Sequence, residues 1–276
     1  MKKIIALVMA LLMIGVVFVG CGSDDTTDTA TADNASSASE LDQIKANGKL
    51  VIGYTVYKPM NYTDDNGEFV GFDTEYAKLV CDELGVTAEF VEINWDTKEV
   101  DLNSGAIDCI WNGFTITPER EEQLDFTKPY LRNKQVVVIR KDDAAKYTDI
   151  NSLANGTLTA EKGSAGETAI KDNEALKGAA YVESDLQTSA LMAVKAMTAD
   201  ACVVDYTVAT SMAGNGDYAD LMVIDGLALI DEEYGIGFRT GSDITAKVNE
   251  ITDKFISDGT LAALAQKYEL ETSLIK

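Results

Sequence analysis

The sequence predicts an α/β fold made of two similar halves, and two observations lead to this prediction. Apolar runs of strand length alternate with segments whose apolar residues recur every three or four positions, as on one face of a helix. This alternation runs through the first half of the chain and restarts at residue 135. Alternating strands and helices are typical of parallel sheets covered by helices.

Two helix starts organise the first half. Asp73 is expected to cap a helix that ends at Gly85. Thr117 and Pro118 are typical of an N-cap and a first helical position, which puts Arg120 in the first turn. The other elements expected in this half are strands at 50–54, 87–93 and 107–111, a hairpin around Asn66-Gly67, and a helix through Val100 and Leu102.

The second half is expected to follow a polar, turn-like segment at residues 129–134. Its most distinctive feature is the turn Gly163-Ser164-Ala165-Gly166, which offers a hydroxyl and backbone N–H groups at the start of a helix. The remaining elements expected are strands at 135–139, 158–162, 181–184, 201–204 and 234–238, helices over 190–197 and 260–268, and a helix capped near Ser242 and Asp243.

The N-terminal residues are typical of a secretory signal, because two lysines precede an uncharged apolar run at residues 4–19. Phe18-Val19-Gly20-Cys21 resembles the lipobox of bacterial lipoproteins, which are cut before the cysteine that receives the lipid. We expect a lipoprotein signal peptide at residues 1–20 and a lipid-anchored flexible linker at 21–45, rich in residues that bury little apolar surface. The alternative is an N-terminal anchor helix. Both interpretations place the rest of the chain outside the cytoplasmic membrane.

The composition excludes several function classes. The net charge is −23, from 46 acidic and 23 basic residues, so the surface repels nucleic acids and anionic lipid headgroups. The absence of histidine removes the common catalytic triads and the commonest zinc ligand. We expect no nucleic-acid partner, no cofactor and no metal.

The four cysteines have no C-x-x-C spacing. Cys21 is the candidate for lipidation. Cys81, Cys109 and Cys202 lie in apolar patterns and are expected to be buried thiols, with a disulfide between Cys109 and Cys202 as the alternative.

Charged and anion-binding groups follow predicted strands in both halves. Arg120 near a helix start favours a carboxylate, although it could instead pair with Glu121 or Glu122 at the surface. The turn at residues 163–166 is a second anion-binding candidate. Asp205 after a buried strand needs a cation or hydrogen-bond donors, or it caps the next helix. Together these groups fit a zwitterion, with its carboxylate on Arg120 and its ammonium on Asp205.

Two motifs resemble the bacterial extracellular solute-binding proteins of the polar amino acid ABC transporter type, solute-binding protein family 3. They are residues 71–80, GFDTEYAKLV, and residues 113–120, GFTITPER, and the resemblance extends over almost all of residues 46–276. It implies a two-lobed, periplasmic-binding-protein-like (type II) fold. Each lobe would be a mixed sheet flanked by helices, and two crossing hinge segments would join the lobes.

The resemblance also implies the lobe boundaries. Residues 46–129 and 235–276 would form lobe 1, and residues 130–234 would form lobe 2 together with the hinge segments. The hinges would lie near residues 129–134 and 230–234.

The ligand-binding residues that the resemblance implies come from both lobes. Arg120 and the Thr115 hydroxyl would hold the ligand carboxylate, helped by Ser164 and the amide of Ala165. The remaining residues implied are the carbonyl of Gly113 and the carboxylate of Asp205 for the ammonium, the aromatic rings of Tyr57 and Trp95 around the ligand, and the amide of Asn112 close to it. For Tyr57 and Trp95, ordinary packing is the alternative.

The function implied is that of a lipid-anchored substrate-binding protein of an amino acid ABC importer, which passes its ligand to a membrane permease. We expect a monomer that is not an enzyme. The alternatives are a dehydratase-like enzyme, with Glu161 or Asp96 as the acid, and a ligand-sensing domain that acts on a separate signalling partner. Asn112, Asp96, Thr55 and Tyr54 favour a ligand with a polar side chain.

Overall fold

Nine strands join into one mixed sheet in the computed structural model, which describes residues 39–276. The expected signal peptide, Cys21 and most of the expected linker lie outside these residues. The strand order is β4-β1-β5-β11-β7-β10-β8-β9, and β6 pairs with β11. These strands are β1 (Lys49–Tyr54), β4 (Thr87–Glu92), β5 (Cys109–Thr115), β6 (Leu124–Phe126), β7 (Leu131–Arg140), β8 (Thr157–Glu161), β9 (Ala180–Ser184), β10 (Ala201–Asp205) and β11 (Leu221–Arg239).

Helices follow most of the strands, as the alternation in the sequence predicts. They are α1 (Glu40–Asn47), α2 (Phe72–Leu84), α3 (Lys98–Asn103), α4 (Pro118–Glu121), α5 (Ala165–Lys171), α6 (Gln187–Lys195), α7 (Tyr206–Met212), α8 (Ile244–Ser257) and α9 (Thr260–Lys267). Short 3₁₀ turns are η1 (Trp95–Thr97), η2 (Lys141–Asp143), η3 (Ile150–Leu153), η4 (Glu174–Leu176) and η5 (Gly216–Tyr218). The predicted hairpin forms a separate two-stranded sheet of β2 (Tyr62–Thr63) and β3 (Phe69–Val70). No helix among the described residues is long and apolar enough to cross a membrane.

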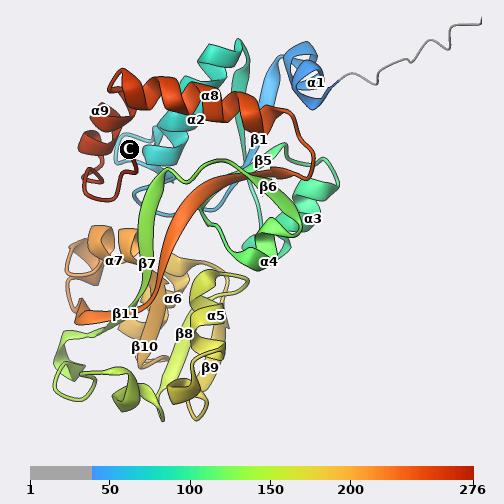
Figure 1. The fold of residues 1–276 in the computed structure, drawn as a ribbon. Coiled ribbons are helices and arrows are strands. Elements are labelled where there is room, and N and C mark those ends of the chain that lie inside the picture. Colours follow the sequence, from blue (N-terminus) through green and yellow to red (C-terminus); the bar gives the residue numbers. More distant parts are fainter. Residues whose placement is uncertain (1–38) are drawn as a thin grey trace, which may run out of the picture. The chain divides into compact units, whose positions relative to one another are not determined.

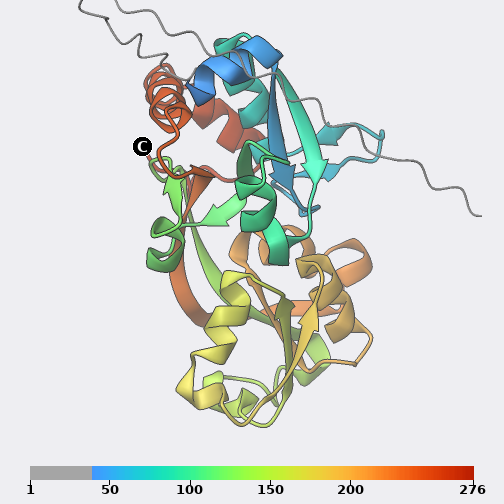
Figure 2. The ribbon, with the colours of Figure 1, turned by 90° about the vertical axis from the view of Figure 1, so that its right-hand side faces the viewer.

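The elements gather in two lobes that share the long strands β7 and β11 (Figures 1 and 2). Lobe 1 contains β1 to β6 with α1 to α4, α8 and α9, and lobe 2 contains β8 to β10 with α5 to α7. Within each lobe the central strands are parallel, as β1 is with β4 and β5, and as β8 is with β9 and β10. The predicted fold class is confirmed. However, the sheets of the two lobes are continuous, because β7 and β11 pair antiparallel along both.

The apolar core supports this arrangement. One cluster of buried side chains extends from lobe 1 into lobe 2 and includes Tyr130 and Tyr234, which lie on the two shared strands or directly beside them. A second cluster lies in lobe 2. A third cluster, in lobe 1, contains Trp95 and Phe114, whose rings meet edge to face with their centroids 5.5 Å apart. This third cluster packs beneath the residues that line the site described below.

The segment at residues 129–134 is not a turn, since β7 begins at Leu131. Its side chains alternate between buried and more exposed, with Leu131, Asn133 and Gln135 buried. The prediction was wrong because Asn133 is a polar residue that points into the protein, where the carboxyl groups of Asp205 and Glu232 accept its hydrogen bonds.

Three further expectations need correction. Gly71, not Asp73, precedes the first turn of α2, and Asp73 is a buried residue inside that turn. Residues 40–45 belong to helix α1 rather than to a flexible linker; α1 is capped by Ser39 and tied to the domain by a hydrogen bond from the Leu41 amide to Asp243. Cys109 and Cys202 are buried free thiols, so the disulfide alternative is wrong.

Candidate functional site

The nine residues that the resemblance assigns to the ligand line one cavity between the lobes. Lobe 1 contributes Tyr57, Trp95, Asn112, Gly113, Thr115 and Arg120, and lobe 2 contributes Ser164, Ala165 and Asp205. Glu161 and Gln187 of lobe 2 line the cavity as well. The centre of a water molecule can move within about 10 Å³ of this cavity, so the cavity has room for about one water. The lobes are therefore closed on each other, and a larger molecule needs them to move apart.

Arg120 lies in the first turn of α4, as predicted, and connects the lobes. Its Nη1 donates to the carbonyl of Thr115 at 2.7 Å, and its Nη2 donates to the carbonyl of Gly163 in lobe 2 at 3.2 Å. The guanidinium carbon lies 4.6 Å from the centre of the Phe114 ring. Burial lowers the pKa of Arg120, but arginine remains protonated in proteins.

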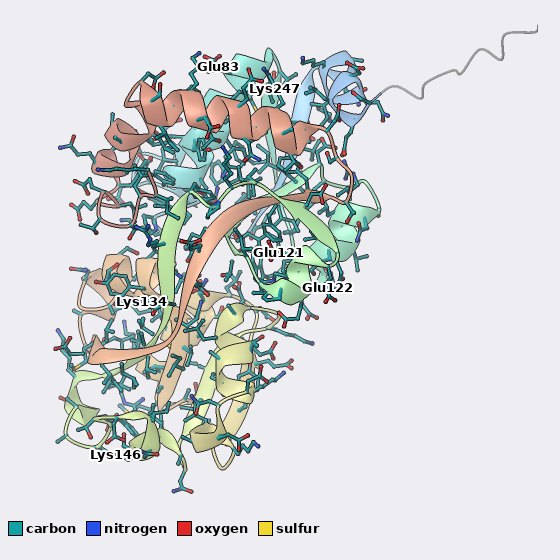
Figure 3. The ribbon with its side chains drawn as sticks, in the orientation of Figure 1. Glu83, Glu121, Glu122, Lys134, Lys146 and Lys247 are labelled. Carbon is teal, nitrogen blue, oxygen red and sulfur yellow. The ribbon has the colours of Figure 1, made fainter. Side chains whose placement is uncertain are left out.

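The surface alternative for Arg120 is wrong. Glu121 and Glu122, labelled in Figure 3, are exposed, whereas the guanidinium of Arg120 points to backbone carbonyls. The sequence prediction of the helix start is confirmed, because Thr117 accepts a hydrogen bond from the Arg120 amide and Pro118 occupies the first helical turn.

Lys98 is a second buried cation that the sequence did not indicate. It is 3% exposed, and its Nζ donates to the carbonyls of Trp95 at 3.0 Å and Gly163 at 3.2 Å. Its ion pair is with Glu99, at 3.2 Å. Burial and the charge of Arg120 lower its pKa. The Gly163 carbonyl thus accepts from two cations of lobe 1, which fixes the turn before α5 against that lobe.

Gly113 occupies a position in β5 that no other residue could take without a rearrangement. Its φ is +54°, and a Cβ would lie 1.7 Å from the hydroxyl oxygen of Tyr57. Its N–H donates to Oδ2 of Asp73 at 2.6 Å, and the Tyr130 hydroxyl donates to the same oxygen at 3.0 Å. Burial raises the pKa of Asp73 to about 7. Asp73 thus holds the strand from which the Gly113 backbone faces the cavity.

The side chain of Asn112 does not offer its amide to a ligand. Its Oδ1 accepts from the N–H and the hydroxyl of Thr55, and its Nδ2 donates to the Thr55 carbonyl and to Oδ1 of Asn61. An asparagine side chain has two donor hydrogens and two acceptor positions, so all four are occupied. The structure therefore corrects the expected role of this amide: it holds two segments of lobe 1 together.

Asp205 ends β10 and is held by three side-chain amides. Its Oδ1 accepts from Nδ2 of Asn133 at 3.0 Å and from Nε2 of Gln135, and its Oδ2 accepts from Nε2 of Gln187. Gln187 also accepts from the Asp205 N–H at 2.9 Å. The side chain makes no cap bond to α7, so the capping alternative is wrong.

A second carboxyl group shares these amides. Oε1 of Glu232, on β11, accepts from Asn133 at 2.5 Å and from Gln135 at 3.0 Å. Burial and then the charge of Asp205 raise the pKa of Glu232 to about 8. Burial raises the pKa of Asp205 as well, while its amide donors favour its charged form. The two acids therefore titrate as a coupled pair, and burial together with their mutual repulsion favours a proton on the pair.

Ser164 caps α5, since its Oγ accepts from the amide of Glu167 at 3.1 Å. That bond uses a lone pair and leaves the hydroxyl hydrogen able to donate. Ala165 follows as the first residue of α5, where backbone N–H groups have no acceptor within the helix. Both residues line the cavity, so lobe 2 presents donors beside its carboxylates.

Of the aromatic residues considered for the ligand, two line the cavity and one does not. Tyr57 and Trp95 line the cavity and are buried in the closed protein. Burial, followed by Asp205 and Asp73, raises the pKa of Tyr57, which stays a neutral phenol. Tyr54 instead packs on Phe69 and Phe90, away from the residues that line the cavity, so it gives no indication of the ligand's side chain.

Several residues of the site were not assigned to the ligand, for identifiable reasons. Gln187 lies at a helix start where the sequence offered no motif, and Glu161 was considered only as the acid of the enzyme alternative. Lys98 is followed by Glu99, and Glu232 lies between Asp231 and Glu233, so in the sequence both resemble solvent-exposed charged residues. A useful signal was available for Glu161, because it ends an apolar strand just before the 163–166 turn, as Asp205 ends another.

Taken together, the fold and the site define a binding protein that closes two lobes over a small polar solute. The chain belongs to the family of bacterial extracellular solute-binding proteins, family 3, whose sequence model matches residues 50–271. The family is one of solute-binding proteins rather than enzymes, and it is extracellular.

Known relatives agree with this assignment. The chain is 30% identical over 276 residues to the ABC transporter glutamine-binding protein GlnH of Bacillus subtilis (strain 168), and 97% of each chain is covered. A crystal structure of a mutant of ArgBP from T. maritima matches with a TM-score of 0.77 and 30% identity, over 83% of this chain and 98% of that one. An ABC uptake transporter substrate binding protein from Streptococcus pneumoniae, solved with bound histidine, matches with a TM-score of 0.76 and 29% identity, over 85% and 97%.

Proposed function

We propose that the protein captures one amino acid between its lobes and delivers it to the permease of an ABC importer. The observation that carries this proposal is that Arg120 of lobe 1 and Asp205 of lobe 2 line the same cavity. An α-amino acid carries a carboxylate and an ammonium on neighbouring atoms, so it fits a site with one fixed charge of each sign. The relatives named above differ in their amino acid, and they support the ligand class rather than one member of it.

Each lining group has a role in this proposal. The guanidinium of Arg120 leaves its backbone carbonyls and binds the ligand carboxylate, with the Thr115 hydroxyl beside it. Ser164 and the Ala165 amide reach the same carboxylate from lobe 2. The Gly113 carbonyl and Asp205 bind the ammonium, and the rings of Tyr57 and Trp95 enclose the ligand. Asn112 supports this arrangement from behind, because its amide is saturated.

The two shared strands act as the hinge. Residues 129–134 and 230–234 lie where β7 and β11 pass between the lobes, and the β7–β11 pairing is irregular between Ala228 and Ile230. The ligand first binds one lobe of the open protein, and the contacts it gains from the other lobe shift the equilibrium to the closed form. In the closed form, the hydrogen bonds of the Gly163 carbonyl with Arg120 and Lys98 join the two lobes.

Delivery to a permease requires the protein to stay near the membrane. The lipobox-like sequence ending at Cys21 supports a lipid anchor, and the residues after it supply a tether. A monomer would suffice, because both lobes of one chain line the cavity.

The test is a thermal-unfolding screen of the purified protein, stripped of carried-over ligand by unfolding and refolding. Each of the twenty amino acids is added in excess. A ligand at about 100 times its Kd stabilises the folded state by roughly 2.7 kcal/mol, which raises Tm by several degrees. We expect a few related amino acids to raise Tm and the others to leave it unchanged.

Two results would overturn the proposal. If no amino acid raises Tm, the ligand belongs to another class of small molecule. If the responding compound is consumed over time at substoichiometric protein, the site is catalytic, as in the dehydratase-like alternative. A ligand-sensing role would show instead as binding without any loss of uptake when the protein is removed from cells.

A further inference from the structure

Glu161 is a charged residue of the cavity that the capture of an α-amino acid does not use. It is the last residue of β8 and is 3% exposed, and its side chain lines the cavity. Its Oε1 is buried and has no hydrogen-bond partner among the described residues. A buried carboxyl oxygen without a partner is costly, so such a group indicates a missing ligand atom.

The acidic and basic side chains that line the cavity are not equal in number. Arg120 is one base, and Asp205 and Glu161 are the two acids among the lining residues, so the charge of the closed cavity balances only while one acid keeps a proton, which the raised pKa of Glu161 favours. The α-carboxylate and α-ammonium of an amino acid would occupy Arg120 and Asp205 and add no net charge. Glu161 would then remain unpaired in a closed cavity.

The neighbouring lysine does not satisfy Glu161. Nζ of Lys98 is held by the carbonyls of Trp95 and Gly163, and its ion pair is with Glu99. Lys98 lowers the pKa of Glu161, but burial and the charge of Asp205 outweigh it and raise that pKa to about 8. Glu161 therefore lacks a close cation in the ligand-free protein.

We propose that Glu161 is the side-chain subsite of the pocket and that the ligand is an amino acid with a positively charged side chain. This inference rests on the proposed function, since it assumes that Arg120 and Asp205 hold the α-carboxylate and α-ammonium. Glu161 and Asp205 end two paired parallel strands, β8 and β10, so both carboxylates face the cavity from the same edge of lobe 2. A guanidinium or a terminal ammonium would supply the partner that Oε1 lacks and would bring the charge of the site to zero.

The experiment compares isosteric ligand pairs by calorimetric titration of the stripped protein. The pairs are arginine with citrulline and lysine with 2-aminoheptanoic acid, in which the charge is removed with little change of shape. We expect at least one cation to bind about 30-fold or more tightly than its neutral partner, as is typical when one side of a buried charge pair is removed. We expect E161Q to lose most of this preference through weaker binding of the cation.

E183Q is the matched control. Glu183 lies on the adjacent strand β9, is 50% exposed and pairs with Lys162 at 3.4 Å. The E183Q substitution removes one negative charge from the same end of lobe 2 at a residue that does not line the cavity, so the cation preference should remain.

The outcomes separate this inference from the proposed function. Binding of a neutral amino acid as tight as that of its cationic partner, in the wild-type protein, overturns the subsite and leaves the proposed function standing. A cation preference that survives in E161Q also overturns it. If no member of either pair binds and the full amino acid screen is silent, the proposed function itself fails. The wild-type comparison requires no variant, so a misfolded E161Q does not prevent the test.

Discussion

Lobe 1 and lobe 2 line the same cavity with polar groups that are held in different ways. In lobe 1, the amide of Asn112 has all four hydrogen bonds, Asp73 accepts from the Gly113 backbone, and Arg120 donates to carbonyls. In lobe 2, Asp205 lies among amide donors and Glu161 has a carboxyl oxygen without a partner. At the cavity, lobe 1 therefore leaves only the Tyr57 hydroxyl without a partner among its described lining residues, whereas lobe 2 leaves an oxygen of an acid without one.

This difference shows how the closed state can depend on the ligand. Closing the lobes buries two acids of lobe 2 beside one lining cation of lobe 1, and burial raises the pKa of Glu161 to about 8. A ligand with a positively charged side chain favours the ionised form of Glu161 in the closed cavity, so it stabilises the closed form more than the open one. The three predictions below test the two sides of the comparison separately.

The largest effect is expected for Arg120→Ala. We propose that this residue binds the ligand carboxylate in a closed site, and truncating one side of such a buried charge pair costs about 3–5 kcal/mol of binding free energy. Calorimetric titration with the amino acid found in the screen measures this loss. Lys254→Ala is the control, since Lys254 lies on α8 with a side chain that is 53% exposed and pairs with Glu83, so affinity should stay unchanged. A loss of less than a few-fold for Arg120→Ala would mean that the carboxylate binds elsewhere.

The sequence was most informative where a residue's role is local. Thr117 and Pro118 determine the start of α4 by cap chemistry, so the position of Arg120 could be predicted from its neighbours. The alternation of strands and helices likewise predicted the strand ends that gather at the cavity. The nine residues assigned by resemblance line one cavity, although only the binding experiments test their roles.

The sequence was least informative for polar residues that are buried, because a polar residue usually indicates a turn or an exposed position. Asn133 contributed to the predicted turn because its acceptors, Asp205 and Glu232, are far away in the sequence. Asn112 suggested a ligand contact because Thr55, which uses up its amide, is also distant in the chain. Such pairings across strands leave no periodic signal, and only the three-dimensional structure shows them.

A smaller effect, on stability rather than binding, is expected for Asn112→Ala. The change leaves buried groups of Thr55 and Asn61 without partners, at about 1–3 kcal/mol each, so the free energy of unfolding should fall by at least about 2 kcal/mol. Affinity measured well below the unfolding transition should change by less than about threefold, since the amide faces lobe 1. Urea unfolding and titration on the same preparation compare the two. A large loss of affinity in a stable variant would return Asn112 to the ligand contacts.

The smallest effect is expected for Glu232→Gln, and it depends on pH. Burial raises the pKa of Glu232 from 4.5 to about 8, so between these values the folded protein holds a proton that the unfolded chain releases. The stability of the ligand-free protein should therefore fall as pH rises through this window. A glutamine oxygen can accept from Asn133 and Gln135 as Oε1 of Glu232 does, and the side chain stays neutral at every pH. We therefore expect Glu232→Gln to be nearly neutral at pH 5 and to be more stable than the wild-type protein at pH 8.5.

Urea unfolding at the two pH values measures this difference, and Glu233→Gln is the control, because its side chain is 47% exposed and should show no such dependence. Some decline of stability with pH should remain in Glu232→Gln, because burial also raises the pKa of Asp73 to about 7 and that of Glu161 to about 8. If the variant is instead less stable than the wild-type protein at pH 8.5, ionised Glu232 is stabilised in the folded protein and its pKa is not raised. Glu232 would then be charged near neutral pH as well, and a cationic ligand would offset more negative charge of lobe 2 on closing.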